Sequence, residues 1–128
     1  MTLQPLVPKG QEALYEQYGY VPAVLRDGVV YVSGQLGNLA DGTIPEDPQA
    51  QYRQVFENVK AVLALAGTDA SRIIKGTSFH VGLQAHMGAM MAARTEAGIP
   101  THIAWTGVGV TELALPGAII EIEVVAEV

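Results

Sequence analysis

The stretch DPQAQYRQVFENVKAVLALAG, residues 47–67, carries the clearest secondary-structure signal in the sequence. Asp47 is a favourable helix N-cap and Pro48 suits the first helical turn, whereas Gly67 is typical of the residue that follows a helix end. Between them, apolar residues recur at helical spacing on one side: Tyr52, Val55, Phe56, Val59, Val62, Leu63 and Ala66. We therefore predict an amphipathic helix that covers an apolar surface.

The residues before this helix predict a β-hairpin. Residues 20–25 are rich in apolar side chains, Arg26-Asp27-Gly28 is a turn signal, and residues 29–33 are β-branched or aromatic. Residues 34–47 are expected to be a loop, and residues 1–19 an extended arm with one short turn.

The residues after the helix predict a strand at 73–83, a second helix at 84–97, and strands at about 102–111 and 118–126. The second helix is expected to end at Gly98. Its expected apolar face holds Met87, Met90, Met91 and the aliphatic stem of Arg94.

The resulting order β-β-α-β-α-β-β predicts a single α+β domain over residues 1–128, in which one sheet carries both helices on one face. No helix is left to cover the other face. Because a large exposed apolar patch marks an interface, this order predicts self-association.

Composition excludes several classes of function. A net charge of −6 disfavours nucleic-acid binding. The chain has no cysteine, and His80, His86 and His102 lack metal-ligand spacing, so we expect neither a metal nor another cofactor. Neither a signal peptide nor a membrane span is recognisable, so we expect a cytoplasmic protein that does not act at a membrane.

Two stretches can carry chemistry. Glu121 and Glu123 share one face of the last strand, which indicates either a solvated face or a carboxylate that positions water. At the end of the hairpin, Ser33 is a strand-end hydroxyl, and Gly34 permits close approach of a ligand or of a neighbouring chain.

The only tryptophan, Trp105, stands in THIAWTGVGV, residues 101–110. It shares a strand face with Gly107 and Gly109, which offer the indole nothing to pack against. Either a neighbouring element fills that space or a ligand enters it.

YVSGQLG (31–37), QYRQVFENVKAVLALAG (51–67), the Val-Gly-Val segment and LPGAIIEIEVVA (115–126) together resemble the RidA/YjgF family of reactive imine and enamine deaminases. The resemblance runs from about Tyr20 to Ala126. It implies a chorismate-mutase-like fold, a homotrimer and small-molecule clefts between the subunits.

The resemblance also implies a site. Tyr20, Ser33 and Glu121 match pocket positions of the family, Glu121 being the catalytic residue, and the main chain of Gly107 would help to orient water. In the deaminases an arginine before a Ser or Thr holds the substrate carboxylate. Trp105, followed by Thr106, stands there instead.

Indole has one N–H donor and no charge, so Trp105 cannot replace the paired bonds of a guanidinium. It either plugs the cleft or offers a flat face to a planar or cationic ligand. Arg94 could reach in as a substitute cation, although its predicted place on a helix argues against that.

Three functions follow. The first is hydrolysis of an imine or enamine other than a simple 2-imino acid, and the second is a catalytically inactive trimeric module that binds or senses a metabolite. The third comes from the family's older naming as endoribonucleases and is disfavoured by the acidic charge.

Overall fold

The computed structural model describes residues 2–128, which form one mixed sheet and three α-helices. The elements are β1 (Gln4–Leu6), α1 (Glu12–Tyr18), β2 (Ala23–Arg26), β3 (Val29–Leu36), α2 (Pro48–Leu65), the 3-10 turn η1 (Ala70–Arg72), β4 (Ile73–His80), α3 (Leu83–Glu96), β5 (Ala104–Gly109) and β6 (Ile120–Glu127).

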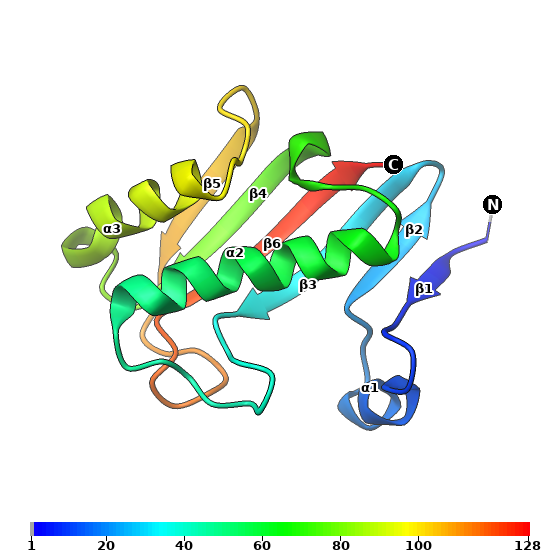
Figure 1. The fold of residues 1–128 in the computed structure, drawn as a ribbon, viewed down its shortest axis with the longest axis horizontal. Helices are drawn as coiled ribbons and strands as arrows, with labels where there is room; N and C mark the ends of the chain where they lie inside the picture. The colour runs from blue at the N-terminus through cyan, green and yellow to red at the C-terminus, as the bar shows by residue number, and fades with distance from the viewer. Residues whose placement is uncertain (1) are drawn as a thin grey trace.

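The sheet has the order β1-β2-β3-β6-β4-β5, in which only β4 and β5 pair in parallel. Figure 1 shows α2 and α3 in front of the sheet, on the same face, with the short α1 beyond one end of β2 and β3. The predicted α+β arrangement, one sheet with two helices on one face, is confirmed.

The α2 helix begins and ends where its sequence predicts. The Asp47 carboxylate accepts a hydrogen bond from the Gln49 N–H at 3.2 Å, and Gly67 adopts a φ of +73° just beyond the helix end. The buried side of α2 packs on alternate residues of the strands. The fully buried residues of this core include Val30, Tyr52, Val55, Phe56, Val59, Leu63, Ile73, Ile120 and Ile122.

A buried amide fixes two loops beside the core. Gln51, in the first turn of α2, donates from Nε2 to the carbonyl oxygens of Pro45 and Gly117 at 3.1 and 2.9 Å. Its Oε1 accepts the Ile119 N–H at 2.9 Å. The amide is thus fully bonded, and the loop before β6 is held against the start of α2.

Three details of the sequence prediction are wrong. The N-terminal arm contains a strand and a helix, β1 and α1, and β3 continues to Leu36 within the predicted loop. On α3 the buried residues are Met90 and Ala93, whereas Met87 and Met91 are exposed. The helix is therefore rotated from its expected orientation.

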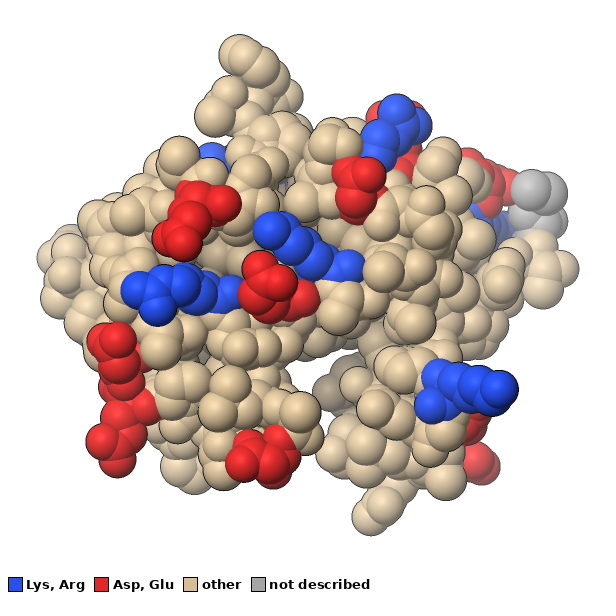
Figure 2. Space-filling model, in the orientation of Figure 1, with Lys and Arg blue, Asp and Glu red and all other residues tan. Residues whose placement is uncertain are grey.

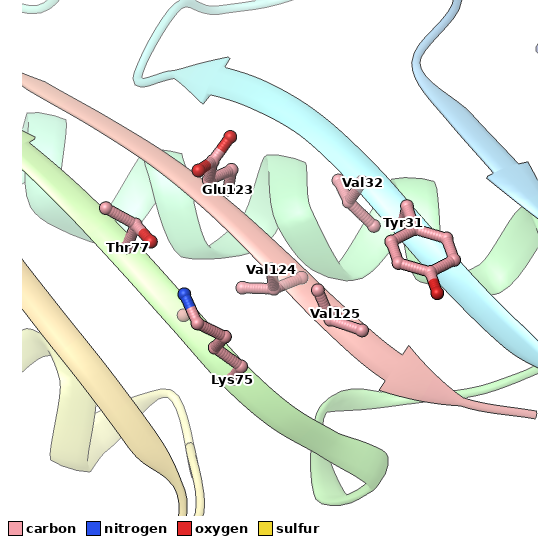
Figure 3. A pocket seen from close by; sticks show the side chains of 8 residues that line it. Tyr31, Val32, Lys75, Thr77, Glu123, Val124 and Val125 are labelled. Atoms are coloured by element: carbon pink, nitrogen blue, oxygen red, sulfur yellow. The ribbon is translucent and has the colours of Figure 1, made fainter.

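The sheet face opposite α2 and α3, called the open face below, has no helix over it. Figure 3 looks onto this face, with α2 behind the sheet. Tyr31, Lys75, Thr77, Glu123 and Val125 line a shallow hollow of about 200 Å³ there. Among residues 2–128, no helix has the length and apolar character needed to cross a membrane.

Candidate functional site

Glu121 lies on the open face beside a β-bulge in β3. The pairing of β3 with β6 shifts between Val32 and Gln35, so that Ser33 and Gly34 together oppose one residue of β6. A Cβ atom added to Gly34 would lie 2.7 Å from Oε2 of Glu121. Because only glycine leaves this room, Gly34 is what allows the carboxyl group to lie against β3.

The surroundings of Glu121 favour its protonated form. Its side chain is half-buried, and this burial raises the pKa of the carboxyl group above the ordinary value; repulsion from the carboxylate of Glu123 raises it further. A carboxyl group tuned in this way can exchange a proton with a bound ligand or with water.

Ser33 and Tyr20 lie at the same end of the hairpin. The Ser33 hydroxyl donates a hydrogen bond of 2.7 Å to the carbonyl oxygen of Val21, so it holds the chain just after Tyr20. The Tyr20 side chain is 53% exposed, and its ring stacks on that of Tyr18, with the Tyr15 ring edge-on to both. The strand-end hydroxyl therefore supports an exposed aromatic cluster.

Trp105 lies on the opposite face of the sheet, the one that α2 and α3 cover. In the parallel pair, Trp105 stands beside Gly76 of β4. A Cβ atom added to Gly76 would lie 2.2 Å from Cζ3 of the indole. The indole thus packs on a bare stretch of the neighbouring strand, which answers how it can sit beside Gly107 and Gly109.

The edge of the indole joins a buried polar pair. Nε1 of Trp105 donates to Oγ of Ser78 at 2.9 Å, and this oxygen lies 2.7 Å from Nε2 of His80. Ser78 and His80 are both 1% exposed. Burial lowers the pKa of His80, so its ring is neutral, and its Nδ1 has no hydrogen-bond partner within residues 2–128.

Arg94 covers the outer side of the indole. Its Cζ lies 4.6 Å from the centroid of the Trp105 ring, and its Nη2 donates to the carbonyl oxygen of Pro100 at 3.0 Å. Arg94 therefore does reach the indole from its helix, although its predicted place there argued against it as a substitute cation.

The expected site residues fall into two groups. Tyr20, Ser33, Gly34 and Glu121 belong to the β2, β3 and β6 part of the molecule, which we call the glutamate group. Trp105, Thr106 and Gly107 belong to the edge strand β5, and we call them the tryptophan group. β4 separates β5 from β6, and Glu121 and Trp105 lie on opposite sheet faces.

The comparisons with known proteins identify the family of the chain. The family model described as endoribonuclease L-PSP matches residues 10–128. The chain belongs to the endoribonuclease L-PSP family. The chain is similar to the RutC family protein YjgH of Escherichia coli K12, which is 38% identical over 122 residues, covering 94% of this chain and 92% of the relative.

Solved structures of similar proteins share the fold. A structure described as protein YjgH has a TM-score of 0.87 and 36% identity, with 100% of this chain and 98% of the other covered. Escherichia coli TdcF, solved with bound serine, has a TM-score of 0.76 and 32% identity, covering 85% and 87% of the two chains. The resemblance to the RidA/YjgF family and its fold is confirmed.

Three residues of this L-PSP family member were missed around Trp105: Gly76, Ser78 and, through Ser78, His80. The spacing of Ser78 and His80 on one strand gives a signal, because alternate residues share a face. The partnership of β4 with Trp105 depends on the register of the parallel pair, which the sequence does not specify.

No group of three or more His, Asp or Glu side chains within residues 2–128 could hold a metal ion. Figure 2 shows the helix-covered face of this L-PSP family protein, where basic and acidic side chains are interspersed among uncharged ones. No continuous basic stripe crosses that face.

Proposed function

We propose that this protein binds a small metabolite in clefts between the subunits of a homotrimer and hydrolyses an imine or enamine there. In this proposal Glu121 positions the attacking water, Tyr20, Ser33, Gly34, Trp105 and Thr106 shape the pocket, and the main chain of Gly107 helps to orient the water. The reaction needs no cofactor, nucleic acid or membrane, and we place it in the cytoplasm.

The observation that carries the proposal is the Glu121 carboxyl group. It is half-buried, lies against the bare backbone of Gly34, and has a raised pKa. Water addition to a C=N bond requires proton transfer, and a positioned carboxyl group with a raised pKa retains its proton more readily than an ordinary one and can donate it.

The separation of the two groups supports a cleft between subunits. One chain places Glu121 and Trp105 on opposite faces of the sheet, so a single pocket that contains both requires a second copy. The open face exposes about half of the Tyr31 side chain, which a neighbouring subunit would cover. TdcF with bound serine shows that a relative holds a small amino acid.

The test is ammonia release from freshly generated imines and enamines. We expect weak activity on 2-aminoacrylate and stronger activity on an aromatic or neutral imine, because Trp105 replaces a carboxylate-holding arginine. Glu121→Gln should lower turnover about 100-fold or more. The matched control is Glu127→Gln, an exposed glutamate on the same strand that does not contribute to the raised pKa of Glu121, and it should retain activity; equal losses in both variants would refute the role of Glu121.

A second candidate, an inactive ligand-binding module, is favoured by the close fit of Trp105 between Gly76 and Arg94. Binding without turnover across the same panel would support it. Trp105→Arg should then gain activity only together with Arg94→Gln, because two guanidinium groups would otherwise repel one another.

The trimer is tested separately by sedimentation. We expect a mass near three times 13.5 kDa. Tyr31→Glu, which puts a charge on the open face, should shift the protein toward monomers. A wild-type protein that sediments as a monomer would refute the cleft between subunits.

A further inference from the structure

We propose that the substrate of the candidate site is a protonated imine without a carboxylate, and that its positive charge is bound by the exposed rings of Tyr15, Tyr18 and Tyr20 together with Glu121. This inference names the substrate class of the proposed function and rests on it for the reaction. Three features carry it: the arrangement of the tyrosine rings, the surroundings of Glu121, and the contacts that already engage the tryptophan group.

Three tyrosine rings, called the tyrosine cluster below, meet at the end of α1. Tyr15 and Tyr18 are three residues apart on the helix and so lie on the same side of it. Gly19 adopts a φ of +83° just after the helix and turns the chain, which brings the Tyr20 ring to the other two. The ring centroids are 5.6, 6.1 and 6.1 Å apart, so one small cation can lie within about 6 Å of each centroid, the range of a cation–π interaction.

The faces of these rings are open, in contrast to those of the Trp105 indole. The rings of Tyr18 and Tyr20 are 19° from parallel, but their centroid distance of 6.1 Å exceeds the separation of about 3.5–4 Å at which carbon atoms touch. Neither ring therefore fully covers a face of the other. Both side chains are more than half exposed, and the Tyr15 ring stands nearly perpendicular to both. The tyrosine cluster thus presents electron-rich ring faces to a ligand.

The tyrosine cluster and Glu121 are connected through two consecutive residues of β3. The Ser33 hydroxyl donates a hydrogen bond of 2.7 Å to the carbonyl oxygen of Val21, the residue after Tyr20. The next residue of β3, Gly34, is the one whose missing Cβ atom makes room for the Glu121 carboxyl group. The rings and the carboxyl group therefore belong to the same end of the hairpin, where we place the ligand.

Glu121 has no cation partner among residues 2–128. The only ion pair there joins Glu57 to Lys60, at 3.6 Å. The carboxylate of Glu123 repels that of Glu121 and adds to the effect of burial in raising the pKa of Glu121. A bound cation would offset this repulsion and favour the ionised carboxylate, so a positively charged ligand is stabilised by Glu121 and stabilises it in return.

The tryptophan group offers little to an acid group. Its indole N–H is donated to Ser78, and the two faces of the ring are occupied by Gly76 and by the guanidinium of Arg94. Arg94 in turn donates to the carbonyl oxygen of Pro100. The positive charge nearest to the indole is thus already engaged, whereas the open tyrosine faces and the carboxylate favour a cation.

A protonated imine fits these surroundings and the proposed reaction. Protonation makes the carbon of a C=N bond more electrophilic, so the form that the site binds is also the form that water attacks. The water oxygen bonds to this carbon and the C–N bond then breaks, which gives an aldehyde or ketone and an ammonium ion. The net charge of −6 also favours the approach of a cation.

Binding is tested with three five-membered rings that are stable in water. Pyrrolidine is protonated at neutral pH and mimics a cyclic iminium ion, proline adds a carboxylate to the same ring, and tetrahydrofuran is uncharged. We expect pyrrolidine to bind at least about tenfold more tightly than the other two, since a contact with a charged group contributes that much. In an NMR titration with labelled tyrosine, the Tyr15, Tyr18 and Tyr20 ring signals should shift, and those of the buried Tyr52 should not.

Substitutions separate the rings from the charge. Tyr18→Leu should weaken pyrrolidine binding about two- to fivefold, whereas Tyr18→Phe, which keeps the ring, should leave it unchanged. Glu121→Gln should weaken it about tenfold, and Glu127→Gln, on the same strand, is the control. If Tyr18→Leu does not fold, the contrast between the three ring compounds decides.

Turnover is tested with a matched pair of imines. A flavin-dependent amine oxidase generates benzaldimine from benzylamine, and an amino-acid oxidase generates 2-imino-2-phenylacetate from phenylglycine; the two imines differ only in the carboxylate. We expect the protein to accelerate ammonia release from benzaldimine at least about tenfold more than from the acid.

Equal binding of pyrrolidine and proline, unshifted signals of the tyrosine cluster, or unchanged affinity in the folded Tyr18→Leu and Glu121→Gln variants would overturn the inference. Faster turnover of the imine that carries the carboxylate would also overturn it, yet would support the proposed function. A protein that binds pyrrolidine through the tyrosine cluster but releases ammonia from neither imine would retain the cation site and lose the deaminase.

Discussion

The glutamate and tryptophan groups both depend on a glycine in a neighbouring strand, but the two glycines make room for different kinds of side chain. Gly34 admits the end of a flexible carboxylate on the open face. Gly76 admits a rigid indole on the face covered by helices. The absence of a Cβ atom makes room at both places, but the Glu121 carboxylate stays free to move, whereas the Trp105 ring is held by its other contacts.

The largest effect is expected from Gly76→Ala. The new methyl carbon would overlap a ring that Arg94 and Ser78 prevent from moving, so we expect a loss of about 3 kcal/mol in unfolding free energy. Urea denaturation measures it. In a Trp105→Ala background the same change should cost little, because the overlap is gone; equal costs in both backgrounds would contradict the assigned contact.

A smaller effect is expected from removing the hydroxyl group of each site. Ser78→Ala leaves the Trp105 N–H and a buried imidazole nitrogen without a partner, which should cost about 2 kcal/mol. Ser33→Ala leaves only a partly solvated carbonyl group unpaired and should cost about 1 kcal/mol. The two variants are compared by thermal and urea unfolding. A larger loss from Ser33 would show that the buried network contributes less than its geometry indicates.

Gly34→Ala should barely affect stability, with a change within about 1 kcal/mol, because the Glu121 carboxylate can swing aside and alanine restricts the unfolded chain. Turnover, in contrast, should fall, since the carboxyl group leaves its half-buried position. Urea unfolding and the ammonia assay measure the two properties on the same preparation. Full activity of Gly34→Ala would contradict a catalytic role for the Glu121 carboxyl group in its half-buried position.

The smallest effect is a pH dependence. Because the pKa of Glu121 is raised above 4.5 in the folded protein, the folded state binds the proton more tightly than the unfolded chain. Stability due to this group is therefore highest below pH 4.5 and falls as the pH rises through the raised value. Glu121→Gln should be more stable than the wild type at about pH 7 and similar to it at about pH 4.

The same comparison separates Glu121 from His80. Burial lowers the pKa of His80 below 6.5, so its contribution has the opposite sign, and stability is lost as the pH falls through the lowered value. Since both the wild type and Glu121→Gln contain His80, the difference between them isolates the carboxyl group. A difference that is larger at about pH 4 than at about pH 7 would contradict the assigned shift.

The elements with a strong local signal were predicted correctly. The cap and the apolar side of α2 follow from residues that are near one another in sequence, and the alternation of β6 follows from the two-residue period of a strand. The uncovered sheet face follows from the order of the elements. Each of these inferences needs only the spacing and capping of residues close in sequence, or the number of helices available to cover a sheet.

The errors occur where the local signal is weak. α3 is rich in alanine and methionine on all sides, so its spacing does not distinguish the buried Met90 from the exposed Met87 and Met91. α1 has no side-chain cap and no buried residue, and β1 has only three residues. The formation of such short elements depends on contacts with other parts of the chain, such as the pairing of β1 with β2, which local sequence does not reveal.

The candidate site was predicted only in part, because its main contacts depend on strand register. Trp105 was recognised as unusual from its glycine neighbours, but its packing on Gly76 comes from the parallel pairing of β4 with β5. The approach of Arg94 depends on the rotation of α3. Whether Tyr20, Ser33 and Glu121 act on a ligand stays a prediction.

The amide of Gln51 binds main-chain atoms of two loops and no side chain of either. These hydrogen bonds therefore depend on the backbone path of the loops and not on the side chains that the loops carry. Residues 111–116 line a surface hollow with their neighbours, and we expect them to tolerate exchange while the anchored residues Gly117 and Ile119 stay in place. For the engineering of new ligand preferences, the side chains of residues 111–116 are thus the ones to vary, and the hydrogen bonds of Gln51 to Gly117 and Ile119 are the ones to keep.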